Sequence, residues 1–152
     1  LSKTSGEIKI AGYDIDKESS RVRRNVGIIF QNPSLDLNLT AEENIRFHGN
    51  LYGLFPYQPR FSWMDNAYQK KVSHLAEVLG LEKEIFQPVK TLSGGMKRKL
   101  EIIRSLMHNP KILFLDEPTA VLTPSEIEDF FNILRKLKAS GKTIVLITHK
   151  ID

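Results

Sequence analysis

Residues 92–117 read LSGGMKRKLEIIRSLMHNPKILFLDE and contain the strongest signals for the fold. In its first part, apolar residues recur at helical spacing and predict a helix over residues 93–109. In its second part, the short apolar run 112–115 has the length of a buried strand and ends in Asp116 and Glu117. The stretch therefore predicts a helix followed by a strand that carries two carboxylates at its end.

Three further segments on either side predict strands. Residues 26–30 and 143–147 are continuous apolar runs, as in strands buried on both faces, and residues 7–12 alternate as a half-buried strand does. A helix that begins at the capping box of Thr123 lies between the strands 112–115 and 143–147. Because a strand, a helix and a strand in this order form a right-handed parallel crossover, we expect an α/β fold with a parallel sheet.

The segment 33–109 is predicted to be mostly helical. A capping box and a glycine bound a helix over residues 40–53, and an aspartate cap and a second glycine bound one over residues 65–80. Between them, residues 54–64 contain two prolines and four aromatic residues without periodicity. We expect a packed loop there.

The composition excludes several classes of protein. The chain has 152 residues and is 41% hydrophobic, enough for one domain with a core. Its net charge of +4 is scattered, and the longest basic cluster is residues 97–99, so we expect no nucleic-acid partner. The sequence contains no cysteine, which excludes disulfides and thiolate metal sites. No apolar run approaches the roughly 20 residues that cross a bilayer, so any membrane role is peripheral.

Polar residues follow the three apolar strands: Gln31 the first, Asp116 and Glu117 the second, and His149 the third. In open parallel sheets, ligands bind beyond the carboxyl ends of the strands. Asp116 and Glu117 end their strand in the form of a Walker B motif, in which the aspartate helps to bind Mg²⁺ and the glutamate polarises an attacking water. The alternative, strands that merely end in surface polar groups, is weakened because three neighbouring strands end this way.

Ser93, Gly94 and Gly95 lie at the start of the helix predicted over residues 93–109. Their backbone N–H groups face outward at the positive end of the helix dipole, and the glycines let an anion approach the backbone closely. The alternative is an ordinary serine cap with a flexible lead-in. A Walker B strand a short way downstream favours the anion site.

These motifs together resemble those of the ATP-binding cassette (ABC) transporter ATPase domain. Gln31, the sequence LSGG at 92–95, the strand 112–117 and His149 occur in that family's order and spacing. The resemblance implies a P-loop-type ATPase core with a parallel sheet and an inserted, mostly helical subdomain.

The resemblance also implies an organisation of the chain. We expect residues 1–152 to form a partial ABC ATPase domain. Its core portions are predicted in 1–32 and 110–152, and the helical subdomain with the signature motif in 33–109.

The resemblance implies ATP and Mg²⁺ as cofactors and gives each strand-end residue a role. Asp116 corresponds to the aspartate that binds Mg²⁺, and Glu117 to the catalytic glutamate. Gln31 is similar to the glutamine that reaches toward Mg²⁺ and the attacking water and links the site to the membrane partner. His149 resembles the switch histidine, which contacts the γ-phosphate.

Ser93, Gly94 and Gly95 resemble the signature motif, which in this family completes the ATP site of the opposite subunit. The implied partners are a second ATPase domain, in a homodimer or a heterodimer, and a transmembrane permease. The implied location is the cytoplasm, peripheral on the inner face of the cell membrane.

The sequence departs from the family pattern in two places. It contains no Gly-x-x-x-x-Gly-Lys-Ser/Thr segment, the loop that cradles the β- and γ-phosphates. We therefore expect an internal fragment, truncated at both ends, that by itself binds ATP weakly and hydrolyses it poorly. Thr123 also stands where many members carry an aspartate that contributes to contacts across the dimer.

Two sets of residues indicate different branches of the family. Residues 93–101 resemble ATPases of drug and polysaccharide export, whereas residues 118–124 and 147–150 resemble those of sugar and nucleoside importers. We favour export, because the signature segment and the stretch before it match more continuously.

Two other functions stay open. One is a soluble ABC ATPase of translation or DNA repair, although the segment between Gln31 and Ser93 shows no heptad repeat for the coiled coil of the repair proteins. The other is a degenerate module that hydrolyses nothing. The intact Glu117 and His149 argue against degeneration.

Overall fold

The structure is a computed structural model that describes residues 6–148. The helices and strands in chain order are β1 (Lys9–Ile10), β2 (Tyr13–Asp14), α1 (Ser19–Asn25), β3 (Val26–Ile29), α2 (Ala41–Leu51), the 3₁₀ helix η1 (Phe61–Trp63), α3 (Asn66–Leu79), the 3₁₀ helix η2 (Val89–Thr91), α4 (Gly94–Leu106), β4 (Ile112–Asp116), α5 (Pro124–Ala139) and β5 (Thr143–Ile147).

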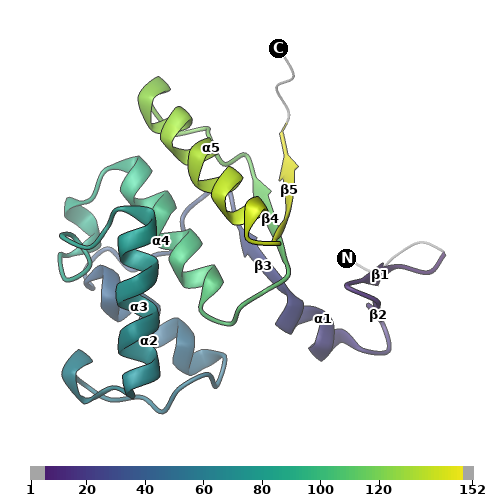
Figure 1. Ribbon diagram of the computed structural model, residues 1–152, viewed down its shortest axis with the longest axis horizontal. Coiled ribbons are helices and arrows are strands. Elements are labelled where there is room, and N and C mark those ends of the chain that lie inside the picture. The colour runs from purple at the N-terminus through teal and green to yellow at the C-terminus, as the bar shows by residue number, and fades with distance from the viewer. Residues whose placement is uncertain (1–5, 149–152) are drawn as a thin grey trace.

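A three-stranded parallel sheet lies at the centre of the fold (Figure 1). Its strand order is β3-β4-β5, and all three strands run in the same direction. Ile29 of β3 is paired with Leu115 of β4, and Asp116 with Ile147 of β5. The carboxyl ends of the strands therefore meet at one edge, and the prediction of an α/β fold with a parallel sheet is confirmed.

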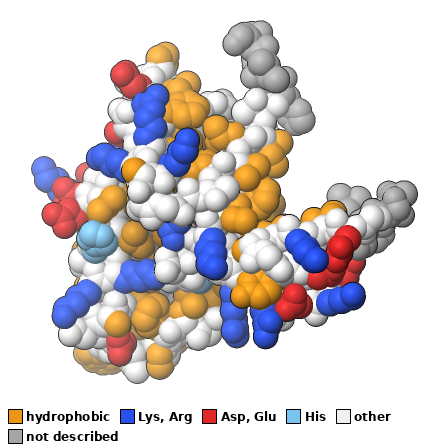
Figure 2. Space-filling model, turned by 45° about the vertical axis from the view of Figure 1, so that its right-hand side comes forward, with side chains coloured by type: hydrophobic (Ala, Val, Ile, Leu, Met, Phe, Trp, Pro, Cys, Tyr) orange, Lys and Arg blue, Asp and Glu red, His pale blue; other side chains and the backbone are white. Residues whose placement is uncertain are grey.

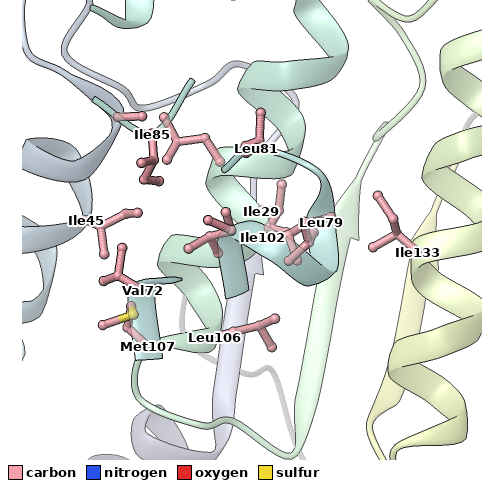
Figure 3. Close-up of a cluster of buried hydrophobic side chains, with 14 of the residues drawn as sticks. Ile29, Ile45, Val72, Leu79, Leu81, Ile85, Ile102, Leu106, Met107 and Ile133 are labelled. Carbon is pink, nitrogen blue, oxygen red and sulfur yellow. The ribbon is translucent and has the colours of Figure 1, made fainter. Parts of the chain in front are cut away.

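Helices α2, α3 and α4 gather on one side of the sheet, and α5 connects β4 to β5 (Figure 1). One cluster of buried side chains joins them to the sheet, with Ile45 from α2, Val72 from α3, Ile102 from α4, Ile29 from β3 and Ile133 from α5 (Figure 3). Burial of such apolar side chains is the main stabilising contribution to folds of this kind.

Gly27 lets α4 and its following turn approach the sheet closely. A Cβ atom at this position would lie 2.6 Å from Leu113 Cδ2 and 3.3 Å from Ser105 Cβ. A side chain here would force the Leu113 side chain of β4 to shift and would press on α4 at Ser105, which would have to give by a few tenths of an ångström.

The helix boundaries follow the capping signals of the sequence. Thr40 forms the predicted capping box with Glu43, and Thr123 forms one with Glu126. Gly80 ends α3 in the left-handed conformation, with φ 67°. Helix α4 ends at Leu106, three residues before the predicted end, because the chain turns toward Pro110 through a left-handed backbone two residues beyond the cap.

The predicted strand over residues 7–12 is shorter than expected. Only Lys9–Ile10 is extended, and it pairs antiparallel with β2 rather than joining the parallel sheet. The cause is the pair Ala11 and Gly12, whose φ angles of 53° and 86° form a two-residue hairpin turn. Helix α1 follows this hairpin without having been predicted.

The expectation that the strands over residues 26–30 and 143–147 are buried on both faces is wrong, and β5 leaves Leu146 and Ile147 exposed. Ile28 and Phe30 are 50% and 55% exposed, because the described helices cover the opposite face, to which Ile29 points. In Figure 2, hydrophobic side chains form a strip that leads down from the grey C-terminal residues, where β5 lies. One face of the sheet therefore presents apolar side chains at the surface.

The segment 54–64 is the expected packed loop, with η1 as its only regular element among the described residues. Phe55 and Phe61 pack their rings against Tyr68 of α3, at centroid distances of 5.3 and 6.1 Å. Within residues 6–148, the structure shows no helix with the length and apolar character that a bilayer crossing requires.

Candidate functional site

The predicted strand-end residues lie at the carboxyl edge of the sheet. Gln31 comes just after β3, Asp116 is the last residue of β4, and Glu117 follows it directly. The side chain of Gln31 is exposed, and the two acidic residues are half-buried. His149, predicted to complete this edge after β5, lies outside the described residues.

Glu117 has an unusual backbone. Its φ angle of 42° lies in the left-handed region, which costs a residue other than glycine about 1–3 kcal/mol. Both sides of the residue are held in place: its N–H donates to Ile147 O at 2.9 Å, and its carbonyl accepts from Arg98 Nη2 at 3.4 Å. The neighbouring strand and helix α4 therefore fix the direction in which Glu117 leaves β4.

Arg98 brings the backbones of Gln31 and Glu117 together. Its Nη2 donates to Gln31 O at 2.8 Å as well as to Glu117 O. Its Nη1 donates to the Phe30 carbonyl and to Glu101 Oε2. Arg98 is not among the site residues predicted from the sequence; the available signal was its pairing with Glu101 three residues later on the helix.

The donor set at this edge fits a magnesium ion. Mg²⁺ prefers oxygen ligands and is usually held by one or two carboxylates together with substrate phosphates. Asp116 and Gln31 offer a carboxylate and an amide oxygen from adjacent strands. Among residues 6–148, no three His, Cys, Asp or Glu side chains gather into a metal-binding group.

The start of α4 forms a second group of predicted site residues. Ser93 caps the helix by accepting from the Met96 N–H at 3.1 Å. Its hydroxyl also donates to Glu126 Oε1 at 2.9 Å, and the Gly95 N–H donates to the same oxygen at 3.1 Å. The predicted anion donors thus hold a carboxylate from α5.

The two glycines of this motif allow two close approaches, that of Glu126 at Gly95 and that of the Val121 carbonyl at Gly94. A Cβ atom on Gly95 would lie 2.7 Å from Glu126 Oε1, and one on Gly94 would lie 3.0 Å from Val121 O. Beside them is a hollow of about 210 Å³ lined by Ser93, Gly95, Met96, Lys99, Glu126, Asp129 and Phe130. In the single chain, the donors at the start of α4 therefore hold the Glu126 carboxylate beside this hollow.

Glu126 is predicted from the sequence only as a helix cap, and its contact with the start of α4 was not foreseen. Its Oε2 accepts from the backbone N–H and the hydroxyl of Thr123, while its Oε1 faces Ser93 and Gly95. The Thr123 backbone N–H first, then Ser93 and the Thr123 hydroxyl, lower the pKa of Glu126 to about 2. Its carboxylate is thus held in the charged form.

The contact of Glu126 with Ser93 and Gly95 predicts that the stability of the fold depends on pH in the acid range. The pKa of Glu126 in the folded chain lies below its ordinary value of 4.5, so the contact stabilises the fold above about pH 4.5. That contribution is lost as the pH falls toward 2. In a ¹³C NMR titration of the full-length protein, we expect the Glu126 carboxyl and the Gly95 amide to shift with one midpoint near 2. Ser93→Ala should raise that midpoint, and an ordinary midpoint in the unchanged protein contradicts the contact.

The family profile and the similar proteins all point to the same family. The sequence profile described as ABC transporter matches residues 1–120. The linearmycin resistance ATP-binding protein LnrL of Bacillus subtilis is 32% identical over 148 residues, which are 97% of this chain and 45% of that protein. The Nod factor export ATP-binding protein I of Ralstonia nicotianae is 37% identical over 148 residues, 97% of this chain and 43% of that protein.

Solved structures agree with the sequences. The cassette cbiO1 from Clostridium perfringens, part of the ABC transporter complex cbiONQ, has a TM-score of 0.83 at 29% identity, over all of this chain and 59% of its own. The ADP conformation of MJ1267, an ATP-binding cassette of an ABC transporter, has a TM-score of 0.81 at 28% identity, over all of this chain and 62% of its own.

This chain belongs to the ABC transporter family, because the family profile covers most of its length. It resembles the ATP-binding component of those transporters in both sequence and fold. The chain spans less than half the length of the two relatives named above.

Proposed function

We propose that this chain is the catalytic portion of a subunit that hydrolyses Mg-ATP to drive a membrane transporter, in the direction of export. The observation that supports this most strongly is the meeting of Gln31, Asp116 and Glu117 at one edge of the parallel sheet. The direction of transport is proposed because several relatives are named for drug resistance or for Nod factor export.

Each strand-end residue has a task in this proposal. Asp116 and the amide oxygen of Gln31 would hold Mg²⁺. Water would attack the γ-phosphorus of bound Mg-ATP, the bond to the β–γ bridging oxygen would break, and ADP and phosphate would leave. The carboxylate of Glu117 accepts a hydrogen bond from the attacking water and takes up its proton. His149, which resembles the switch histidine of the family, would donate to the γ-phosphate oxygens.

The start of α4 would serve a second copy of the domain. Ser93 Oγ and the Gly95 N–H lie at the positive end of a 13-residue helix, where a phosphate is favoured. Glu126 already satisfies these donors with a carboxylate in the single chain. An ATP phosphate from the partner subunit would take the place of that carboxylate, which makes the dimer part of the catalytic unit.

A hollow next to α2 is the proposed contact for the transmembrane permease. It is lined by Ser34, Asp36, Leu39, Asn44, Phe47, His48, Leu51 and Arg104. Leu51 is 83% exposed, and Phe47, 40% exposed, stacks on Tyr57. Arg104 donates to Ser34 O and Ser34 Oγ, both at 2.6 Å, so the hollow is tied to the segment that follows Gln31.

We expect Leu51→Asp to release the full-length protein from membranes that contain its permease. The substitution removes the apolar area that Leu51 would bury against the permease, and the new carboxylate must lose its water on binding. The measurement is the share of the protein that sediments with membranes. Val78→Asp, at an exposed apolar position of α3, is the matched control, and equal loss in both variants contradicts the proposed contact.

Fractionation of cells separates the proposed function from its main alternative. A transport ATPase should sediment with membranes in a permease-dependent way and hydrolyse ATP only with Mg²⁺. Sedimentation with ribosomes and not with membranes would instead support a soluble ABC ATPase of translation.

A further inference from the structure

We propose that Arg98 is a positioning residue that ties the signature helix α4 to the two strand ends that carry Gln31 and Glu117. This inference rests on the proposed function. It goes beyond it because Arg98 touches neither nucleotide nor metal in that proposal. Arg98 acts through the backbone of residues that do.

The side chain of Arg98 is fully buried, unlike that of an ordinary surface arginine. It is 0% exposed, and its terminal nitrogens donate to four oxygen atoms. Three of these oxygens are main-chain carbonyls, those of Phe30, Gln31 and Glu117. They come from the ends of β3 and β4, so a single guanidinium spans two neighbouring strands of the sheet.

Glu101, on the same helix, extends the hydrogen bonds of Arg98 to the segment that follows Gln31. It is 2% exposed, it forms an ion pair with Arg98 at 2.8 Å, and its other oxygen accepts from the Ser34 N–H at 3.3 Å. Arg98 therefore holds the beginning of the segment 31–34, and Glu101 holds its end. The backbone that carries Gln31 is fixed to α4 on both sides.

The contact with Glu117 has a specific consequence. Glu117 occupies the left-handed region, with φ 42°, and its carbonyl is one of the Arg98 acceptors. The same carbonyl also accepts from the Ala120 N–H at 3.2 Å, a bond within the following turn that does not reach α4. Without Arg98, the peptide after Glu117 therefore loses its connection to α4 and can shift together with that turn. The carboxylate would then move relative to the attacking water, and a displacement of about 1 Å can lower a rate roughly 100-fold.

Arginine suits this position better than any other residue. Its planar fork presents separate N–H groups to several acceptors, whereas the lysine ammonium is one compact centre on a flexible stem. Because α4 begins at the signature motif, movement of its first turn is transmitted to both strand ends through this fork. Arg98 thus connects the face that meets the twin subunit with the catalytic edge.

The chain contains a matched control in Arg46 of α2. Arg46 is also buried, at 4% exposed, and forms an ion pair at 3.0 Å with Glu42, which is 2% exposed. It also donates to a main-chain carbonyl, Gln58 O, at 2.8 Å. It differs from Arg98 in that its acceptors lie in the helical part, away from the strand ends.

The test compares Arg98→Lys with Arg46→Lys in the full-length protein, by the kcat and KM for Mg-ATP and by Tm. We expect both variants to lose thermal stability to a similar extent. Arg98→Lys should lower kcat about 100-fold with little change in KM, whereas Arg46→Lys should change neither constant by more than about threefold. Equal kcat values in the two variants overturn the proposal.

A second measurement covers the case in which Arg98→Lys folds poorly. The double variant R98M/E101L replaces the buried pair with apolar side chains, a change that proteins often tolerate. It should be more stable than a variant that leaves one of the two charges buried and unpaired, and it should still lack turnover; full turnover overturns the positioning role.

Amide hydrogen exchange gives a reading that needs no catalysis. Arg98→Lys should speed exchange in residues 30–34 and 115–120, and Arg46→Lys should not; equal protection in both variants overturns the proposal. If the full-length protein hydrolyses no Mg-ATP at all, the proposed function is wrong. The difference in hydrogen exchange between the two variants would still support the role of Arg98.

Discussion

We expect Glu117→Gln to lower the turnover of Mg-ATP by the full-length protein by about 10²–10⁴-fold, the usual contribution of a general base. Glutamine keeps the size of the side chain and its place at the end of β4, but it cannot accept a proton at neutral pH. The half-buried position of Glu117 and the hydrogen bonds of its main chain to Ile147, Ala120 and Arg98 do not depend on the side-chain carboxylate. Binding of Mg-ATP should therefore persist while hydrolysis becomes slow.

The measurement is steady-state phosphate release together with the affinity for Mg-ATP from calorimetry. Glu77→Gln, which removes the same charge from an exposed position of α3, is the control and should turn over normally. If Glu117→Gln releases phosphate as fast as the control, Glu117 is not the base.

The second large effect is expected from Gly95→Ala. A Cβ atom at this position would lie 2.7 Å from Glu126 Oε1 and would occupy the place where an anion meets the Gly95 N–H. Loss of one well-placed N–H donor to a transition state lowers rates by about 10²–10³-fold. We expect a fall in turnover of that size, together with loss of the hydrogen bonds from Ser93 and Gly95 to Glu126.

Gly49→Ala is the control for this variant. Gly49 lies within α2, and its added Cβ would meet Phe55 at 3.8 Å, an ordinary van der Waals contact. Alanine in a helix interior is favoured over glycine by about 1 kcal/mol, so this variant should be as active and at least as stable. Normal turnover in Gly95→Ala would remove the start of α4 from the catalytic unit.

The parts of the fold that the sequence predicts correctly depend on neighbours close in the chain. The capping boxes of Thr40 and Thr123 and the glycine stop at Gly80 act within one helical turn. The β4-α5-β5 crossover follows from periodicity and handedness alone. These signals are local, so a single sequence contains them completely.

The features that the sequence does not predict depend on residues far apart. The exposure of Ile28 depends on which face of the sheet the helices cover, and those helices lie many residues away. The burial of Arg98 follows from main-chain acceptors that are 19 to 68 residues distant in the chain. Glu126 has a predictable local role as a cap, but its contact with Ser93 spans 33 residues.

The candidate site is divided in the same way. The motifs at Gln31, Ser93 and Asp116 are visible in the sequence because each is a short run next to a strand or a helix start. How close these motifs lie to one another depends on the tertiary structure. Arg98 connects two of them, because it donates to the carbonyls of Gln31 and Glu117. His149 stays a prediction, since it lies outside the described residues.

The most direct test of the central claim is a structure of the full-length Glu117→Gln protein with Mg-ATP. The account predicts two copies face to face, with Gln31 and Asp116 at the Mg²⁺, the residue at position 117 next to the γ-phosphate, and Ser93 of the partner donating to that same phosphate. A nucleotide bound elsewhere, with these side chains on separate surfaces and no common cavity, would contradict it.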